Sequence, residues 1–211
     1  LVFAHAVEDR DEGLLVLAIH FSQLDRHERY LFESESVEKE EGKGMMRRSK
    51  QALSAEECAQ ILQRNTSGVL ALADRDQMPC AVPLSYVWDG QSLYFHCADQ
   101  GEKLDIAREN PKASFCVIDR DDVDPEKFTT RYISVIAKGS IQILEDEAEI
   151  CQALMWLGEK YSGRMGEKAI REHIESAWDH VKIIKLTPFE ITGKMGSQVR
   201  RERMEQNEGM A

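Results

Sequence analysis

The sequence predicts a mainly β (α+β) fold, an antiparallel barrel of about six strands with flanking helices. Three observations lead to this class. Apolar segments rich in β-branched residues recur along the chain, short turns join most of them, and helices are expected at the start, in the middle and near the end. Strands linked by hairpins favour an antiparallel barrel over a parallel sheet with crossover helices. The 211 residues, 42% of them hydrophobic, are enough for one substantial domain with an appendage.

Net charge and hydropathy exclude several classes of function. The net charge of −11 and the pI near 5.1 argue against non-specific binding of nucleic acid. No apolar run approaches the ~18 residues of a membrane-spanning helix, and the first residues lack the basic region of a signal peptide. The five cysteines form no C-x-x-C pair, so neither a disulfide framework nor a zinc site is expected. We therefore expect a cytoplasmic protein without a nucleic-acid or membrane partner.

The first 44 residues differ in charge from the rest. They carry 11 acidic and 5 basic side chains and end in the charged segment 38–44. Every residue of that segment has a codon made of purines alone, and Met45-Met46 follows directly, as a start codon follows a bacterial ribosome-binding site. One hypothesis is that the natural protein starts at Met45 or Met46. The alternative is a genuine N-terminal arm with a short helix over 13–24.

The chain is therefore divided into an extension over 1–44, a folded domain over 45–196 and a charged C-terminal tail over 197–211. The folded domain is expected to open with a capped helix. Ser54 and Glu57 have the spacing of a capping box, in which both side chains accept hydrogen bonds from free backbone amides of the first turn. Cys58, Ile61 and Leu62 follow at helical spacing and predict one buried face of the helix.

A hairpin is expected in the middle of the domain. A strand over 80–88 contains Pro83, which cannot donate a ladder hydrogen bond and therefore indicates an edge, a bulge or a point facing a ligand. Asp89-Gly90 is a strong turn signal, and 93–96 is the returning strand.

A short helix is expected to start at Gly101 and to end at Asn110-Pro111. Its inward residues are Leu104, Ile106 and Ala107. The remaining expected elements are strands over 68–73, 113–118, 132–144 and 181–192 (the last interrupted by Pro188), an acidic loop over 119–127, and helices over 145–160 and 169–181.

Several motifs of well-known chemistry are missing. The chain has no glycine-rich Rossmann or P-loop fingerprint, no H-E-x-x-H and no G-x-S-x-G. His173 and His180 are two helical turns apart, but two exposed helix histidines explain them more simply than a metal pair. Trp156 and Trp178 are expected to anchor the core or an interface.

The segment from Pro79 to Pro111 carries the strongest signal of a site. The second strand of the hairpin runs into Gly101 and then into a helix N-terminus that bears Lys103. Free amides, the helix dipole and a lysine together form a phosphate seat, with Ser85 and Cys97 nearby. A solvated helix start with an exposed lysine is an equal alternative on spacing alone.

This segment resembles the flavin-binding split-barrel family that includes pyridoxamine 5′-phosphate oxidase, and most of all its 5-nitroimidazole resistance branch. The resemblance covers about residues 45 to 196. The matching residues are Met46-Arg47-Arg48, Pro79, Pro83-Leu84-Ser85-Tyr86, Tyr94-Phe95-His96-Cys97-Ala98, Gly101-x-Lys103, Asn110-Pro111, Ala137-Lys138-Gly139 and Ile191-Thr192-Gly193-Lys194.

The resemblance implies a six-stranded antiparallel split β-barrel that forms a homodimer, with FMN bound at the subunit interface. Lys103 would hold the phosphate beside Gly101, and Tyr132 would reach the flavin from the other subunit. The residues implied along the flavin are Ala81, Val82, Pro83, Leu84, Ser85, Tyr86, His96 and Cys97.

Two departures from the oxidase pattern affect this expectation. Glu102 stands where the oxidase has a basic residue before the phosphate lysine, so Arg47, Arg48 or Lys138 would have to supplement the phosphate contact. The oxidase's arginine- and histidine-bearing substrate motif is replaced by the sequence 193–196, which argues against pyridoxamine phosphate as the substrate.

The resulting hypothesis is an FMN-dependent oxidoreductase. Its acceptor would be a small molecule, a nitroaromatic by resemblance, and its electrons would come from NAD(P)H or a separate reductase. His96 is the catalytic candidate, because an imidazole beside the flavin can donate a proton or polarise a nitro group, whereas Cys97 is expected only to pack. The alternative is a flavin- or haem-binding module without turnover, with His96 as an axial ligand.

Overall fold

The computed structural model describes residues 5–8, 15–18 and 49–208, and the chain divides into two units at residues 47 and 48. In the first unit, strands β1 (His5–Glu8) and β2 (Leu15–Ala18) form an antiparallel pair. The short helix predicted over 13–24 is therefore wrong for Leu15–Ala18, because the backbone of this segment pairs with β1; the rest of that range lies outside the described residues. Met45 and Met46 also lie outside them, so the proposed start site stays a prediction.

The second unit is built around one antiparallel sheet. Within residues 49–208 its seven strands are β3 (Ser67–Ala73), β4 (Pro79–Ser85), β5 (Val87–Trp88), β6 (Leu93–Ala98), β7 (Lys112–Asp124), β8 (Thr129–Ile143) and β9 (Val181–Met195). Their order in the sheet is β4-β3-β7-β8-β9-β6-β5. Every neighbouring pair is antiparallel, which confirms the predicted fold class.

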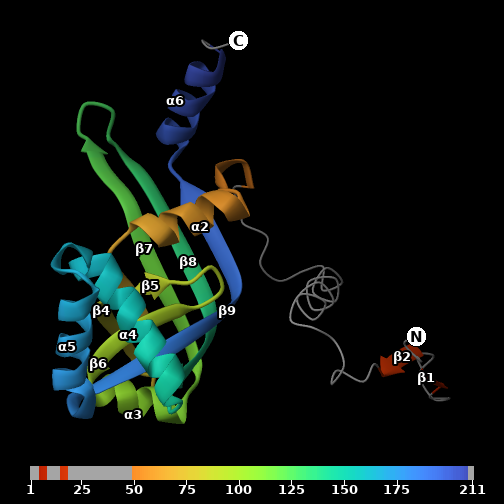
Figure 1. Cartoon of the computed structure of the whole chain (residues 1–211). Helices are drawn as coiled ribbons and strands as arrows, with labels where there is room; N and C mark the ends of the chain where they lie inside the picture. Colours follow the sequence, from red (N-terminus) through yellow and green to blue (C-terminus); the bar gives the residue numbers. More distant parts are fainter. Residues whose placement is uncertain (1–4, 9–14, 19–48, 209–211) are drawn as a thin grey trace. The chain divides into compact units, whose positions relative to one another are not determined.

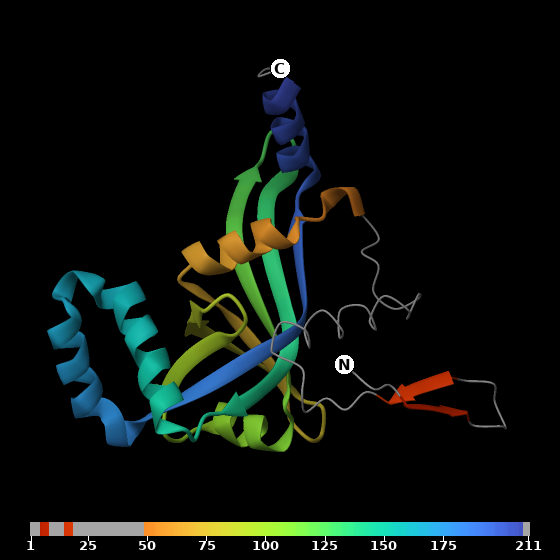
Figure 2. The same ribbon diagram turned by 45° about the vertical axis from the view of Figure 1, so that its right-hand side comes forward.

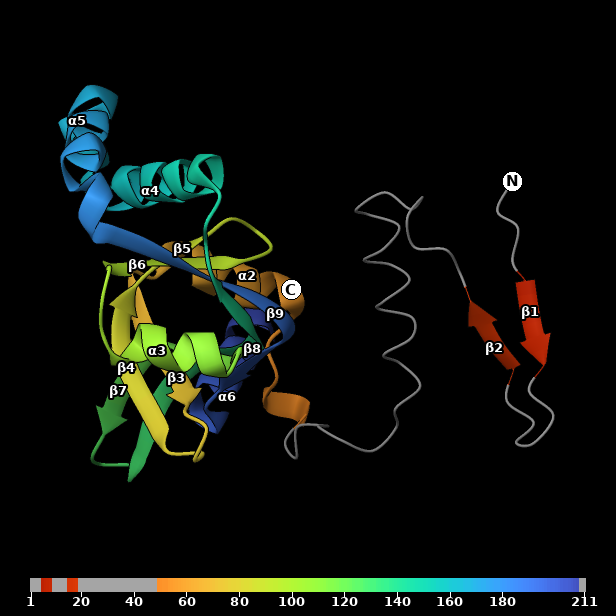
Figure 3. The same cartoon turned by 90° about the horizontal axis from the view of Figure 1, so that it is seen from below.

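Helices flank this sheet (Figures 1 and 2). They are η2 (Ser49–Gln51), α2 (Ala55–Arg64), α3 (Glu102–Glu109), α4 (Glu147–Ser162), η3 (Gly163–Met165), α5 (Glu167–Ala177), η4 (Trp178–His180) and α6 (Ser197–Glu208). Helix α2 crosses β7, β8 and β9, while α4 and α5 lie side by side. Figure 3 shows α3 across one end of the strands. No helix among the described residues is long and apolar enough to cross a membrane.

The capped helix is confirmed. The Glu57 amide donates to Ser54 Oγ at 3.1 Å, and the Ser54 amide donates to Glu57 Oε2 at 2.8 Å. The predicted face of Cys58, Ile61 and Leu62 is buried in the main core. The short helix α3 is confirmed in the same way, with Leu104, Ile106 and Ala107 buried.

The two edges of the sheet are joined by one residue. Strand β4 is one edge, β5 is the other, and only Tyr86 lies between them in the chain. Because one residue spans less than ~4 Å, the sheet has to roll until its edges meet. The strand predicted over 80–88 is thus two strands, which is why the sheet has seven strands rather than six. Pro83 lies on the edge strand β4, as predicted.

Tyr86 is fixed at this junction from two sides. Its side chain is fully buried, and its hydroxyl donates to the Leu62 carbonyl at 2.8 Å. The Tyr161 hydroxyl, from the end of α4, accepts from the Tyr86 amide at 2.9 Å, contacts the Tyr86 carbonyl at 2.7 Å and also contacts the Thr66 carbonyl. These contacts satisfy the backbone groups that neither β4 nor β5 can pair.

The faces of the rolled sheet have different neighbours. Inward side chains such as Leu70, Phe95, Phe115 and Val135 form the main core. On the outer face, α4 covers Tyr94 of β6 and its neighbours, and the Tyr94 ring packs edge-to-face on Trp156 with centroids 5.5 Å apart.

The acidic loop predicted over 119–127 is wrong over most of its length, because β7 continues to Asp124 and pairs with β8. The acidic side chains are tolerated there because arginines neutralise them. Asp119, beside a register shift, pairs with Arg64 at 2.6 Å, and Asp124 pairs with Arg131 at 2.6 Å.

The last strand is continuous, whereas the sequence predicted an interruption at Pro188. The ladder between β8 and β9 shifts register between Lys138 and Gly139, so that Gly139 lies opposite Pro188. A side chain at Gly139 would bring its Cβ within 2.2 Å of the Thr187 carbonyl oxygen. A glycine therefore lets the strand pass the proline with a local irregularity.

Most of the segment expected as a charged tail forms α6. Val199 is buried, Glu202 bonds to Arg131 at 2.8 Å, and Arg203 pairs with Glu57 of α2. The charges of this segment therefore attach the helix to the domain.

We expect the substitution Tyr161→Phe to lower the free energy of unfolding by about 1–3 kcal/mol, because it leaves the Tyr86 backbone groups without their partner. Urea denaturation of the purified protein measures this. Tyr132→Phe is the matched control, since no described residue hydrogen-bonds the Tyr132 hydroxyl, and it should change stability by less than ~0.5 kcal/mol. An equal, small effect of both substitutions would contradict the role assigned to Tyr161.

Candidate functional site

The predicted flavin-lining segment of β4 presents alternate residues to opposite faces of the sheet. Ala81, Pro83 and Ser85 are exposed on the outer face. Val82 lies opposite the buried Leu70, so it points inward, as does Leu84, which packs on the main core. Only the three outer side chains can therefore touch a ligand on the sheet surface; the inner two can contribute backbone atoms.

Tyr86 and Cys97 also belong to the core. Tyr86 packs edge-to-face on Phe115, with ring centroids 4.9 Å apart, and Cys97 is 8% exposed. Burial raises the pKa of the Cys97 thiol, and the nearby positive charge of Lys103 only partly opposes this shift. At neutral pH the thiol is protonated and acts as a packing group.

His96 lies on the outer face of β6. It is exposed, and its register partner on β9 is Ile183. The imidazole makes no hydrogen bond with another described residue, so both ring nitrogens are available to a ligand. Because β4 and β6 approach each other where the sheet closes, His96 and the outer residues of β4 belong to one side of the rolled sheet.

The start of α3 has the features of an anion seat. Gly101, the residue before the helix, has a φ of 135°, and a side chain there would meet no atom within 4 Å. No side chain caps the helix, so its first amides are open to a ligand. Lys103 lies in the first turn and is half-buried, and Glu102 beside it is exposed. The charge of Lys103 acts on Cys97 of β6, so Lys103 lies close to the end of that strand.

These residues fit a phosphate monoester better than a metal. The seat combines a lysine, uncapped amides and an open glycine, which supply hydrogen-bond donors and positive charge; the acidic side chain of Glu102 in the same turn is exposed. Across the part of the chain that the structure describes, no group of three or more histidine, cysteine, aspartate or glutamate side chains could hold a metal ion.

The remaining predicted residues lie farther along the sheet. Tyr132 of β8 is half-buried, and Lys194 Nζ lies 5.7 Å from its ring centroid. Lys138, suggested as a second phosphate contact, is engaged by Glu190 at 2.9 Å. Arg47 and Arg48 lie outside the described residues. The structure brings β4 into contact with β6, and the start of α3 lies close to Cys97 at the end of β6. Tyr132 lies beside Lys194 and Gly196.

Sequence reasoning missed Lys160, which lies beside Tyr86, the residue that follows β4. Its amino group is buried, has no hydrogen-bond partner among the described residues and lies 4.3 Å from the centroid of the Tyr86 ring. Burial lowers the pKa of Lys160 to about 8. The available signal was helical spacing, because Lys160 and Tyr161 follow the buried Leu157 at three and four residues.

Comparisons with known proteins agree on one fold family. A model of the pyridoxamine 5′-phosphate oxidase family matches residues 54–195. A search of curated proteins gave no match.

Three solved structures show the same fold. A conserved hypothetical protein from Mycobacterium tuberculosis has a TM-score of 0.60 and 18% identity, covering 71% of this chain and 90% of that chain. A candidate 5-nitroimidazole antibiotic resistance protein from Bacteroides thetaiotaomicron has a TM-score of 0.56 and 18% identity, covering 68% and 86%. An FAD- and haem-binding protein from Mycobacterium smegmatis has a TM-score of 0.55 and 20% identity, covering 70% and 74%.

Replacing Lys160 tests its buried charge. The lowered pKa means that the folded state binds fewer protons than the unfolded state between pH 8 and pH 10. This lysine therefore makes the free energy of unfolding rise with pH in that window. Its destabilising effect is largest below pH 8, where it is charged in both states. We expect Lys160→Met to stabilise the protein by about 1–2 kcal/mol at pH 7, with a smaller gain at pH 9.5.

Urea denaturation at several pH values measures the difference between Lys160→Met and the natural protein. The control is Lys168→Met, an exposed lysine of α5, whose effect should not change with pH. A gain that grows with pH would show that the sign of the shift is wrong.

Proposed function

Because the chain belongs to the pyridoxamine 5′-phosphate oxidase family, we propose that it binds FMN and acts as a flavin-dependent oxidoreductase. The observation that carries the proposal is the uncapped start of α3 with Lys103, next to a sheet surface of small side chains. When bound, FMN supplies hydride or electron transfer, which no side chain can perform. The task of the protein is to bind it, orient it and place a proton donor beside it.

The phosphate is assigned to the start of α3. The first amides of the helix donate hydrogen bonds, Gly101 allows close approach of the backbone, and Lys103 adds a full positive charge. Glu102 opposes this charge only weakly, because it is exposed and its field is screened by water and salt.

The flavin ring is assigned to the outer surface next to β4. Ala81, Pro83 and Ser85 are small and leave space for a planar ring. His96 stands on the same side with a free imidazole, from which it can donate a proton to a bound acceptor.

A second copy of the chain is proposed to complete this surface. Val69, Ile118 and Ile136 are 37% to 60% exposed on neighbouring strands of the outer face. In the cross-strand register Val69 aligns with Pro83 and Cys116, and Cys116 aligns with Ile136, so an apolar row crosses from β4 to β8. Such a row favours a homodimer. The partner's copy of this face would also carry a tyrosine at position 132 toward the flavin.

The acceptor is proposed to be a nitroaromatic compound, and the donor NAD(P)H or a separate reductase. Pyridoxamine phosphate is disfavoured by the segment 193–196. Gly193 packs under α2, where a side chain would meet Cys58 Sγ at 2.5 Å, and Met195 is buried in the core. This segment therefore has no basic side chain toward the flavin surface except Lys194, which lies beside Tyr132.

A haem-binding module is the second candidate function. The observation that favours it is the exposed imidazole of His96, which is free to serve as an axial ligand. The absorbance spectrum of the purified protein separates the two: flavin bands support the first candidate and a Soret band the second.

We expect Lys103→Ala to weaken FMN binding more than tenfold, because it removes a charge-assisted phosphate contact of ~1.5–3 kcal/mol. Fluorescence titration of the apoprotein with FMN measures the dissociation constant. Lys168→Ala, an exposed lysine on α5, is the control and should bind FMN normally. An unchanged dissociation constant in Lys103→Ala would refute the phosphate seat.

We expect His96→Ala to retain FMN and to slow the reoxidation of the reduced protein by a 5-nitroimidazole about a hundredfold, as expected for loss of a proton donor. Stopped-flow absorbance after reduction with dithionite measures the rate. His173→Ala, on the exposed side of α5, is the control. Loss of all flavin in His96→Ala would show that the histidine serves binding rather than turnover.

A further inference from the structure

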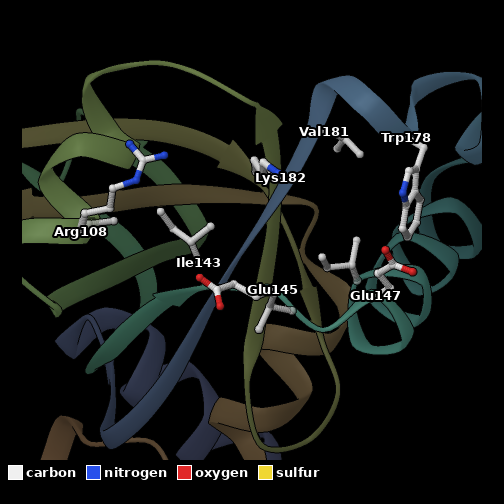
Figure 4. A pocket seen from close by; sticks show the side chains of 10 residues that line it. Arg108, Ile143, Glu145, Glu147, Trp178, Val181 and Lys182 are labelled. Carbon is white, nitrogen blue, oxygen red and sulfur yellow. The ribbon is translucent and has the colours of Figure 1, made fainter.

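The second unit contains a pocket that the proposed flavin site does not use. Its volume is about 620 Å³, within the range of small-molecule sites. It lies between the end of α3, the end of β8, the start of α4 and the segment that leads from η4 into β9 (Figure 4). The side chains that line it are Ala107, Arg108, Ile143, Leu144, Glu145, Glu147, Ile150, Trp178, Val181 and Lys182.

The charged side chains of this pocket are separated along its length. Arg108 and Trp178 lie on opposite sides, with Lys182 between them, and Glu147 lies on the side of Trp178 (Figure 4). Arg108 bonds to Asp105 through one nitrogen at 2.8 Å, which leaves the rest of its guanidinium for a ligand. Lys182 is exposed and forms no ion pair with a described residue. Positive charge therefore extends from the Arg108 end to the middle of the pocket.

The other end combines an aromatic ring with one carboxylate. Trp178 is half-buried and packs against the small core of Met155, Ile170 and Ile174, which holds its indole in place. Glu147 is exposed on the side of Trp178, whereas Glu145 is exposed between Trp178 and Arg108 (Figure 4). The apolar lining between the two ends is partly buried and comes from side chains such as Ile143 and Ile150.

We propose that this pocket binds a nucleoside diphosphate. Arg108 and Lys182 would bind the phosphates, since a guanidinium and an ammonium are the preferred partners of phosphate oxygens. The indole of Trp178 would stack on the base. Glu145 and Glu147 would accept hydrogen bonds from the ribose hydroxyls, the role that an acidic residue has in dinucleotide sites. Arg108 lies on one side of the pocket, Lys182 and Glu145 lie in the middle, and Trp178 lies with Glu147 on the other side (Figure 4). A nucleotide with its phosphates toward Arg108, its ribose in the middle and its base on Trp178 fits this arrangement.

The nucleotide has two possible sources. Lys182 is the register partner of Cys97, which lies within the field of Lys103, and Ala107 follows Lys103 by one helical turn. The pocket therefore adjoins the proposed phosphate seat, and the adenylate half of FAD could reach it from there. A free nucleotide could equally enter from solvent. The proposal does not depend on the flavin seat, because the pocket and its side chains exist without it.

Calorimetric titration of the full chain with ADP tests the pocket directly. We expect Arg108→Gln and Lys182→Gln each to weaken ADP binding about tenfold, the loss of one charge-assisted contact. Arg75→Gln, an exposed arginine in the turn between β3 and β4, is the matched control and should leave ADP binding unchanged. Trp178→Phe should lower the affinity less than either charge substitution, and thermal melting confirms that each variant is folded.

Titration with FAD and FMN distinguishes the sources. If FAD binds more tightly than FMN and Arg108→Gln removes the advantage, the pocket receives the cofactor's own adenylate. If the two flavins bind equally while ADP binds, the nucleotide comes from solution. The proposal is overturned if neither ADP affinity nor the advantage of FAD over FMN changes in Arg108→Gln and Lys182→Gln. Failure of the flavin seat would instead appear as equal FMN binding in Lys103→Ala and the natural protein.

Discussion

The single-residue connection at Tyr86 is the constraint on which the rest of the domain depends. Because β4 and β5 are opposite edges of one sheet, the chain can join them through one residue only if the sheet is rolled. This sharp junction leaves the Tyr86 amide and carbonyl without a hydrogen-bond partner in either strand. The Tyr161 hydroxyl from α4 supplies their partner, and the Tyr86 hydroxyl attaches the junction to the end of α2. Two helices therefore hold the sheet closed.

Closure also determines which residues can form a site. In a flat sheet, β4 and β6 would be five strands apart, and the outer face of Pro83 would never approach His96. Rolling brings both strands to one side, while alternation along each strand turns Leu84 and Cys97 toward the core. Helix α3 follows β6 directly in the chain, so the phosphate seat begins where the strand surface ends.

Local chemistry made much of this predictable. The capping box at Ser54, the turn at Asp89-Gly90 and the helix after Gly101 each depend on neighbouring residues, and each is present. The features that were missed depend on distant partners. Arg64 neutralises Asp119 within the extended strand, and the break at Tyr86 is stabilised by a tyrosine 75 residues away. The division of the predicted site residues between two faces likewise needed the register of the sheet.

Helix α3 connects the two proposed sites. Lys103 and Arg108 are five residues apart, about 7–8 Å along the helix axis, so one short helix presents a cation at each end. The chain as a whole is strongly acidic, and several of its other arginines, such as Arg64, Arg131 and Arg203, are used in ion pairs that hold elements together. The net negative charge of the chain repels anions, so a phosphate ligand can bind only where cations gather locally. Arg108 is also paired with Asp105, but through one nitrogen only, and Lys182 forms no ion pair with a described residue. Helix α3 and the start of β9 therefore present cations that a phosphate ligand can contact.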